Sequence, residues 1–412
     1  MAISPIPHWF EGSEYTHKVA ACIMKYGPIS RITLAQILGL SQGAVSRITS
    51  DLIYAGVIEE TPMAPGQGGR LPKDFVRKNS QKAAQKSGQK ENTERRGRPQ
   101  TGLRIVANAR TFVGMKINTT HITAVAVNAI GQIVTGCHDL PLDDDSPESV
   151  VDVIKQLTMD CADEAVMSGL PAPCAVGVSL GGHITDDSVT TFAPFLHWSK
   201  PVEFSAMIRK ATGLPTGIYN DIDSLAVDAC LFGSGVGLNS FAVVTIGIGV
   251  GYSFTVNGEP VNNPDKSYGL VGHILVDPDG PRCISGHKGC ATCLTDNSIA
   301  TEYSKIIGRP ATFDEFAAAA RASKTQATNL VNRTCFRLGT LIATIANLAM
   351  PDKIMIAGES SFIAKLGVGD LRNGINMYRH SQAAPVDFEI ADHDWAMWGK
   401  AAAAQAIRQY VG

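Results

Sequence analysis

The chain has 412 residues, more than twice the length of an average domain, which predicts two or three folded units. Hydrophobic residues make up 44% of the chain and charged residues 18%, so a sizeable core can be buried. We find no run of about 18 apolar residues and, at residues 1–18, no basic segment followed by an apolar one. We therefore expect no membrane span and no signal peptide, and interpret the chain as soluble and cytoplasmic.

Charge is distributed unevenly along the chain. Residues 1–104 contain 15 Lys and Arg against 8 Asp and Glu, whereas the remaining 308 residues contain 21 against 30. A basic N-terminal segment followed by an acidic remainder predicts a contact with nucleic acid at the N-terminal end. The alternative is a solvated basic tail with no partner.

The N-terminal residues have the pattern of a helix-turn-helix. Apolar spacing predicts helices at residues 14–26, about 33–38 and 42–55. Gly39 fits the turn after the second helix, and the Ser41 hydroxyl fits the N-cap of the third. A helical hairpin without DNA-binding function is the alternative, but the basic charge favours DNA.

The third helix is predicted to read the major groove of a double-stranded operator. Val45 and Ile48 fall on its inner face. The polar positions expected to face DNA are Ser41, Gln42, Ser46, Arg47 and Thr49.

A wing is predicted to follow, with strands at residues 57–60 and 103–106, which completes a DNA-binding domain over residues 1–104. The insertion at residues 61–98 contains ten Lys and Arg against three Asp and Glu, with few large apolar residues, and is expected to be disordered in isolation. Near its end, Arg96 and Arg98 flank a glycine in a narrow segment that suits an A·T-rich minor groove. The alternative is a flexible linker, which we favour for residues 82–94 but not for residues 96–99.

Beyond residue 111 the pattern changes to alternating strands and helices. We expect strands at residues 112–117, 122–128 and 131–134, a helix at 149–168, and a strand at 175–180. A similar order follows Asp221, with strands at residues 240–246, 251–256 and 353–357 and long helices between 312 and 350. Two similar α/β lobes imply a cleft between them.

At this point the sequence resembles the ROK family of repressors, open reading frames and sugar kinases, and within it the winged-helix repressors of sugar operons. The segments that carry the resemblance are the helix-turn-helix, Gly97-Arg98-Pro99, Phe192-Ala193-Pro194, Asn220-Asp221, Gly247 to Gly251, Gly272-His273 and Cys283 to Cys290. The resemblance implies an α/β fold, with a winged helix-turn-helix domain followed by a two-lobed ROK domain that is similar to sugar kinases, actin and ribonuclease H. The lobes are expected at residues 105–219 and 220–394, with a helix at about 395–411 packing back on the first lobe.

The phosphate-binding motif of the family's kinases is degenerate here. Those kinases are expected to carry Asp-x-Gly-Gly-Thr-Lys, and the aligned residues are Lys116 to His121. A lysine replaces the acidic residue that works with magnesium, and side chains replace both glycines that let backbone approach phosphate. We therefore expect no ATP binding and no enzyme activity. Lys116 is expected in a surface ion pair, and attraction of a phosphate by its charge is the alternative.

The resemblance also implies an effector site. Asp221 matches the kinases' general base, and Asn220, Gly182 and His273 match other groups near the sugar, so these four residues are expected to bind a sugar or sugar phosphate. Two carboxylates of the family pattern have become Leu270 and Thr292. Either the effector differs from the usual sugars, or the protein senses no sugar.

Nine cysteines, of which three lie at residues 283–293, suit a reducing compartment and a metal better than a disulfide framework. The resemblance implies structural zinc on one histidine and three cysteines. The expected ligands are His273, Cys283, Cys290 and Cys293, because Ser285 occupies one cysteine position; His287 is the alternative fourth ligand, and a loop of free thiols is the alternative to zinc.

Together these features predict a transcriptional regulator, a repressor of carbohydrate-use genes that binds operator DNA as a homodimer or homotetramer. A sugar kinase with an appended DNA-binding domain and a DNA-binding protein without a ligand are the two alternatives.

Overall fold

The computed structural model describes residues 5–63, 70–77 and 100–412. Two compact units form: the first runs to Asn239 and resumes from Trp395 to Gly412, and the second is Ser240–Asp394. The sequence-based boundary at residues 219 and 220 differs from this division, because helix α7 (Asp221–Phe232) packs against the C-terminal helix α13 (Trp395–Val411) of the first unit.

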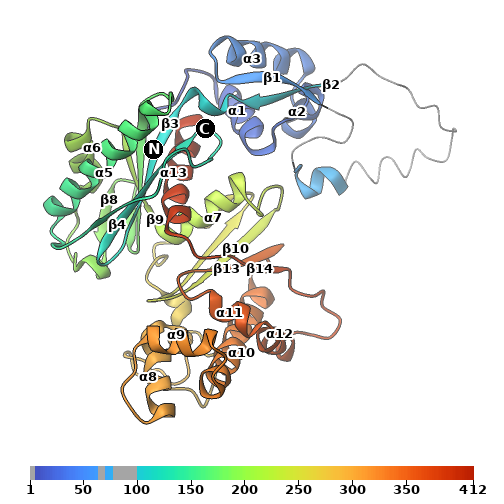
Figure 1. The fold of residues 1–412 in the computed structure, drawn as a ribbon. Helices are drawn as coiled ribbons and strands as arrows, with labels where there is room; N and C mark the ends of the chain where they lie inside the picture. Colours follow the sequence, from blue (N-terminus) through green and yellow to red (C-terminus); the bar gives the residue numbers. More distant parts are fainter. Residues whose placement is uncertain (1–4, 64–69, 78–99) are drawn as a thin grey trace, which may run out of the picture. The chain divides into compact units, whose positions relative to one another are not determined.

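The first unit begins with the predicted helix-turn-helix (Figure 1), formed by α1 (Glu14–Tyr26), α2 (Arg31–Leu38) and α3 (Gln42–Tyr54). Each helix begins at a serine N-cap whose hydroxyl accepts a backbone N–H: Ser13, Ser30 and Ser41. Gly39 ends α2 with a φ of 65°, a backbone conformation that favours glycine.

Strands β1 (Ile58–Met63) and β2 (Gln100–Ile105) pair antiparallel after α3 and form the base of the predicted wing. Within the insertion, residues 73–77 are helical, and the Lys73 backbone N–H donates to the Gly237 carbonyl over 2.9 Å, so this part of the insertion contacts the rest of the first unit. The rest of the insertion, with Arg96 and Arg98, lies outside the described residues.

The body of the first unit is a sheet in the order β5-β4-β3-β6-β9. Its strands are β3 (Thr111–Ile117), β4 (His121–Asn128), β5 (His138–Pro141), β6 (Pro173–Leu180) and β9 (Thr216–Asn220). A short hairpin, β7 (His183–Thr185) and β8 (Val189–Phe192), follows β6.

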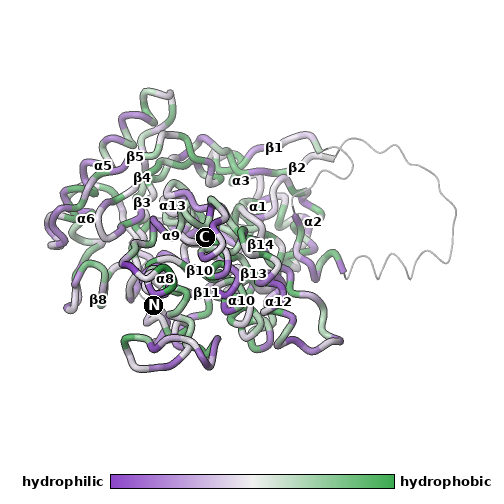
Figure 2. The backbone as a smooth tube through the Cα atoms, turned by 60° about the horizontal axis from the view of Figure 1, so that its bottom comes forward, coloured by the Kyte–Doolittle hydropathy of each residue, from purple (hydrophilic) through white to green (hydrophobic). Residues whose placement is uncertain are grey.

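Helices cover both faces of this sheet. Alternate residues of β3 enter different cores: Phe112 packs with α13, and Val113 packs with α5 (Pro147–Met167) and α6 (Phe204–Thr212). Hydrophilic and hydrophobic residues alternate along α5, as expected of a helix with one face on a sheet (Figure 2). The core that contains Phe112 also includes residues of α1, α2, α3 and the wing strands, so the winged helix and the sheet share one hydrophobic core.

Two glycines allow α13 to lie close to the sheet. A Cβ atom at Gly114 would come within 1.9 Å of the Gly399 carbonyl oxygen, and one at Gly177 within 2.2 Å of the Ala402 oxygen. Any larger residue at either position would push the helix off the strands.

The strand expected at residues 131–134 does not form. Only an isolated bridge joins Val127 to Ile133, and the third strand is β5 instead. The Asn128 side chain explains the difference, because its Oδ1 accepts the backbone N–H groups of Ile130 and Gln132 and holds the segment in a turn.

The second unit contains a sheet in the order β12-β11-β10-β13-β14. Its strands are β10 (Ser240–Ile246), β11 (Val250–Val256), β12 (Glu259–Pro260), β13 (Lys353–Ala357) and β14 (Phe388–Ile390). Its helices are α8 (Asp296–Ile307), α9 (Phe313–Arg321), α10 (Thr325–Leu348), α11 (Phe362–Leu366) and α12 (Val368–Met377). Among the described residues, no helix combines the length and apolar character needed to cross a membrane.

Candidate functional sites

The outer face of α3 carries exposed polar side chains. Gln42, Ser46 and Arg47 are exposed, whereas Val45 and Ile48 are buried in the core, as the spacing predicted. Ser41 is exposed, and its Oγ accepts the Ala44 N–H over 3.2 Å. The helix therefore presents a polar, positively charged face with the donors and acceptors that base edges and phosphates require.

Thr49 does not belong to this face, which corrects the prediction. Its side chain is fully buried and accepts a hydrogen bond from Arg31 Nε over 3.0 Å. Arg31 also pairs with Glu60, at 2.8 Å between Nη1 and Oε1. These contacts join α2, α3 and β1, so Thr49 fixes the geometry of the domain.

Lys116 at the end of β3 forms an ion pair with Asp221 at the start of α7. The pair is buried, with 7% of the lysine side chain and 12% of the aspartate side chain exposed, which corrects the expected surface pair. The Lys116 ammonium also lies 5.3 Å from the centre of the Trp398 ring. The Asp221 carboxylate, which the sequence resemblance matched to the kinases' general base, is thus neutralised by a cation of the protein itself.

Asn220 and Gly182 contact each other. The Asn220 amide Nδ2 donates to the Gly182 carbonyl over 3.1 Å, while its Oδ1 accepts the backbone N–H groups of Ile222 and Asp223. Asn220 is therefore the N-cap of α7. Three of the four expected effector residues, Gly182, Asn220 and Asp221, thus lie together in the first unit. Each of them already forms a hydrogen bond or ion pair with another group of the protein.

A cluster of nitrogen and sulfur donors lies in the second unit. One ligand atom from each of His273, Cys283, His287 and Cys290 falls within 4.8 Å of every other, and the two histidine Nδ1 atoms are 3.1 Å apart. Zinc in a tetrahedral site holds such donors about 3.3–3.8 Å from one another. A contraction of about 1 Å would therefore close the cluster around zinc, and its two imidazoles and two thiols are donors that zinc prefers.

Cys293 lies outside this cluster, which corrects the predicted ligand set. It is buried in a short 3-10 helix, and burial raises the pKa of its thiol to about 12. In contrast, the pKa of Cys283 is lowered: partial desolvation acts to raise it, but hydrogen bonds from Cys290 and from the Ser285 and His287 backbone outweigh that effect. The alternative fourth ligand, His287, therefore replaces Cys293.

The glycine-rich turn at residues 247–249, between β10 and β11, has acidic neighbours. A Cβ atom at Gly247 would lie 2.1 Å from the Glu359 Oε2 atom, and the Asp296 backbone N–H donates to the Gly247 carbonyl. Burial raises the pKa of Asp296 to about 6, with nearby Glu359 and Asp314 adding to the rise and a hydrogen bond from Ser360 opposing it. Carboxylates beside such a turn repel phosphate, and no sequence signal indicated this arrangement.

The sequence model of the ROK family matches residues 112–406. The chain belongs to the ROK family. Among ROK proteins, it is 23% identical over 358 residues to the DNA-binding transcriptional repressor Mlc of Escherichia coli (strain K12), covering 84% of this chain and 80% of that protein. It is 20% identical over 365 residues to the xylose repressor of Bacillus subtilis (strain 168), covering 87% of this chain and 86% of that protein.

Solved ROK structures have the same fold. The structure of a ROK family transcriptional regulator, a homologue of the Escherichia coli Mlc protein, superposes with a TM-score of 0.71 at 23% identity and covers 96% of each chain. A ROK family glucokinase from Streptomyces griseus, in complex with glucose and AMPPNP, gives a TM-score of 0.60 at 20% identity and covers 71% of this chain and 98% of that chain. The kinase thus matches a smaller share of this chain than the regulator does.

Proposed function

We propose that the protein is a DNA-binding transcriptional regulator that represses genes of carbohydrate use. The observation that carries the proposal is the exposed polar face of α3, with Gln42, Ser46 and Arg47, in a helix-turn-helix joined to a ROK domain. In this reading α3 enters the major groove, and the wing, with Arg96 and Arg98, contacts phosphates and the minor groove. The repressors of sugar operons among its relatives support the proposal.

The protein acts as a regulator and not as a kinase. A kinase would need a carboxylate for magnesium at position 116 and a free base at Asp221. The chain instead has a lysine whose ammonium neutralises that base, and Glu359 lies beside the glycine turn of the second unit. ATP and magnesium therefore have no suitable site in these two places.

The effector in this proposal is a sugar or sugar phosphate whose binding changes the spacing of paired DNA-binding domains in a homodimer or homotetramer. His273 stays a candidate contact for it. Zinc on His273, Cys283, His287 and Cys290 would cross-link two loops of the second unit and fix the His273 ring, since a metal-bound imidazole can still donate from its other nitrogen.

Regulation without a ligand is the second candidate. It is favoured by the partners of Gly182, Asn220 and Asp221, all of which are groups of the protein itself. A sugar would have to displace these contacts to bind in the same way as in a kinase.

The test combines operator selection with ligand screening. Purified protein is used to select double-stranded DNA from a random pool, and binding of the selected site is compared between the wild type and Arg47→Ala, with Lys18→Ala as the control on an exposed face of α1. A panel of sugars, sugar phosphates and ATP with magnesium is then scored by thermal shift. Failure to select any DNA site contradicts the proposal. A selected DNA site without a thermal shift for any sugar or sugar phosphate supports the second candidate, and a thermal shift with ATP and magnesium supports a sugar kinase instead.

A further inference from the structure

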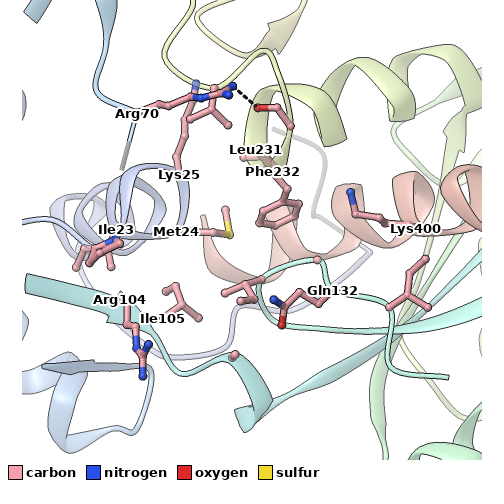
Figure 3. Close-up of a pocket in the computed structure, with 18 of the residues that line it drawn as sticks. Ile23, Met24, Lys25, Arg70, Arg104, Ile105, Gln132, Leu231, Phe232 and Lys400 are labelled. Atoms are coloured by element: carbon pink, nitrogen blue, oxygen red, sulfur yellow. Dashed lines mark hydrogen bonds between the residues drawn. The ribbon is translucent and has the colours of Figure 1, made fainter. Parts of the chain in front are cut away.

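A cavity of about 1200 Å³ lies within the first unit, where the winged helix meets the sheet (Figure 3). Its walls come from the C-terminal end of α1, the base of the wing near Glu59, Arg104 and Ile105, the segment at Arg70, the turn at residues 130–133, the segment 231–236 and Lys400 of α13. Binding sites for small molecules usually have about 300–1,000 Å³, so this cavity is large enough for one.

Much of the wall is apolar. The apolar side chains that line it are Ile23, Met24, Ile105, Ile130, Ile133, Leu231, Phe232 and Val236. Several belong to the shared hydrophobic core of the unit, and Ile133 is 40% exposed. A ligand with an apolar body would remove this surface from water, which stabilises the complex by about 25 cal/mol per Å² of apolar surface covered.

The charged side chains around the cavity are mainly cationic. Lys25, Arg70, Arg104 and Lys400 line it, and Glu59 is the single acidic residue among the described lining residues. Lys400 pairs with Asp228 over 2.7 Å and Arg104 pairs with Glu59, so the expectation of an anion rests on Lys25 and Arg70. Glu59 accepts a hydrogen bond from Arg104 Nε over 2.8 Å, so its charge is already compensated.

Lys25 and Arg70 meet at one end of the cavity. Figure 3 shows the Lys25 side chain extending from α1 toward Arg70, whose Nη1 lies 3.5 Å from the Gly233 carbonyl oxygen. Two adjacent cations on a partly apolar wall raise the local positive potential and attract an anion. Gln132 adds an amide that can donate or accept a hydrogen bond.

We propose that this cavity binds a small anionic amphiphile: a carboxylate, sulfonate or phosphate on an apolar body. The anionic group would lie between Lys25 and Arg70, and the apolar body would pack against the wall near Ile133 and Phe232. This site is separate from the effector residues around Asp221, and its occupant would contact both the winged helix and the sheet. The proposal about binding does not depend on the proposed function.

Anilinonaphthalene sulfonate is a suitable probe, because it joins one sulfonate to an aromatic body and becomes fluorescent on entering an apolar site. Phenylnaphthylamine, the same aromatic body without the sulfonate, is the neutral counterpart. Both are titrated into the full-length protein. Saturable binding of the sulfonate with one site per chain, tighter than that of the amine, is the expected result.

Variants locate the bound probe. Lys25→Gln should weaken binding of the sulfonate by about tenfold, the effect of losing one charge-assisted hydrogen bond, and leave the amine nearly unchanged. Lys18→Gln, on the same helix but outside the cavity, is the matched control. Ile133→Trp should occupy part of the cavity and abolish binding of both probes, whereas Ile248→Trp, at an exposed site in the second unit, should not.

Circular dichroism before titration confirms that each variant is folded. Sulfonate binding that is the same in Ile133→Trp as in the wild type would place the probe elsewhere and overturn the proposal. Equal loss of both probes in Lys25→Gln, or no binding by the wild type, would also overturn it.

Discussion

Replacing Lys116 by Met should destabilise the first unit far more than removing a surface lysine. The substitution keeps the length of the side chain but leaves the Asp221 carboxylate buried without its counterion. Breaking a buried pair in this way costs about 3–5 kcal/mol. With a urea m-value of about 3 kcal/mol/M, the midpoint of unfolding falls by about 1–2 M.

Two further variants make this measurement decisive. Lys18→Met removes the lysine of an exposed ion pair with Glu14; the two side chains are 55% and 78% exposed, so the midpoint of unfolding should stay close to that of the wild type. The double variant Lys116→Met/Asp221→Asn removes both charges and should regain most of the lost stability, because the uncompensated carboxylate is gone. A loss in Lys116→Met as small as that in Lys18→Met would refute our description of the pair as buried and mutually dependent.

Three other predictions concern DNA, metal and pH. Arg47→Ala should weaken binding of a selected operator by about tenfold or more, and Lys18→Ala should not, as measured by fluorescence anisotropy at fixed salt. His287→Ala should remove most of the zinc found by atomic absorption in protein purified with zinc, whereas Cys293→Ser should retain it; the opposite order would contradict the four-residue cluster. Asp296→Asn tests the raised pKa of about 6. The folded protein holds this proton more tightly than the unfolded chain, so wild-type stability falls as pH rises from about 4 to about 6 and the loss persists above. The variant should thus be more stable than the wild type by about 1 kcal/mol at pH 7.5, after allowance for solvent screening, with the gain absent at pH 4, as measured by urea unfolding.

Short-range signals in the sequence predicted the helix-turn-helix well. The spacing of apolar residues gave the bounds of α1, and Gly39 and Ser41 marked the turn and the cap because these signals act within a few residues. Thr49 was assigned to the wrong face because its burial depends on Arg31, which reaches it from a different helix. The turn at residues 130–133 was mistaken for a strand because Asn128 competes locally for backbone hydrogen bonds.

Contacts between residues that lie far apart in the sequence could not be predicted. Lys116 and Asp221 are 105 residues apart, and only the folded sheet shows that the lysine points to the base and not to solvent. Sequence spacing alone favoured Cys293 over His287 as a zinc ligand, because it could not show that Cys293 turns into the core of the second unit. The cavity near Lys25 likewise joins segments that lie far apart in the sequence, from Ile23 to Lys400, and has no local signature.

The way α13 completes the first sheet constrains when each part of the protein can fold during synthesis. The second unit is continuous from Ser240 to Asp394, so all of its residues leave the ribosome before α13 does. The first unit cannot complete its folding until α13 has been synthesised, because α13 packs on Gly114 and Gly177, whose strands are synthesised much earlier. The DNA-binding helices share this core, so a nascent chain that stops short of α13 would expose their apolar surface to chaperones and proteases.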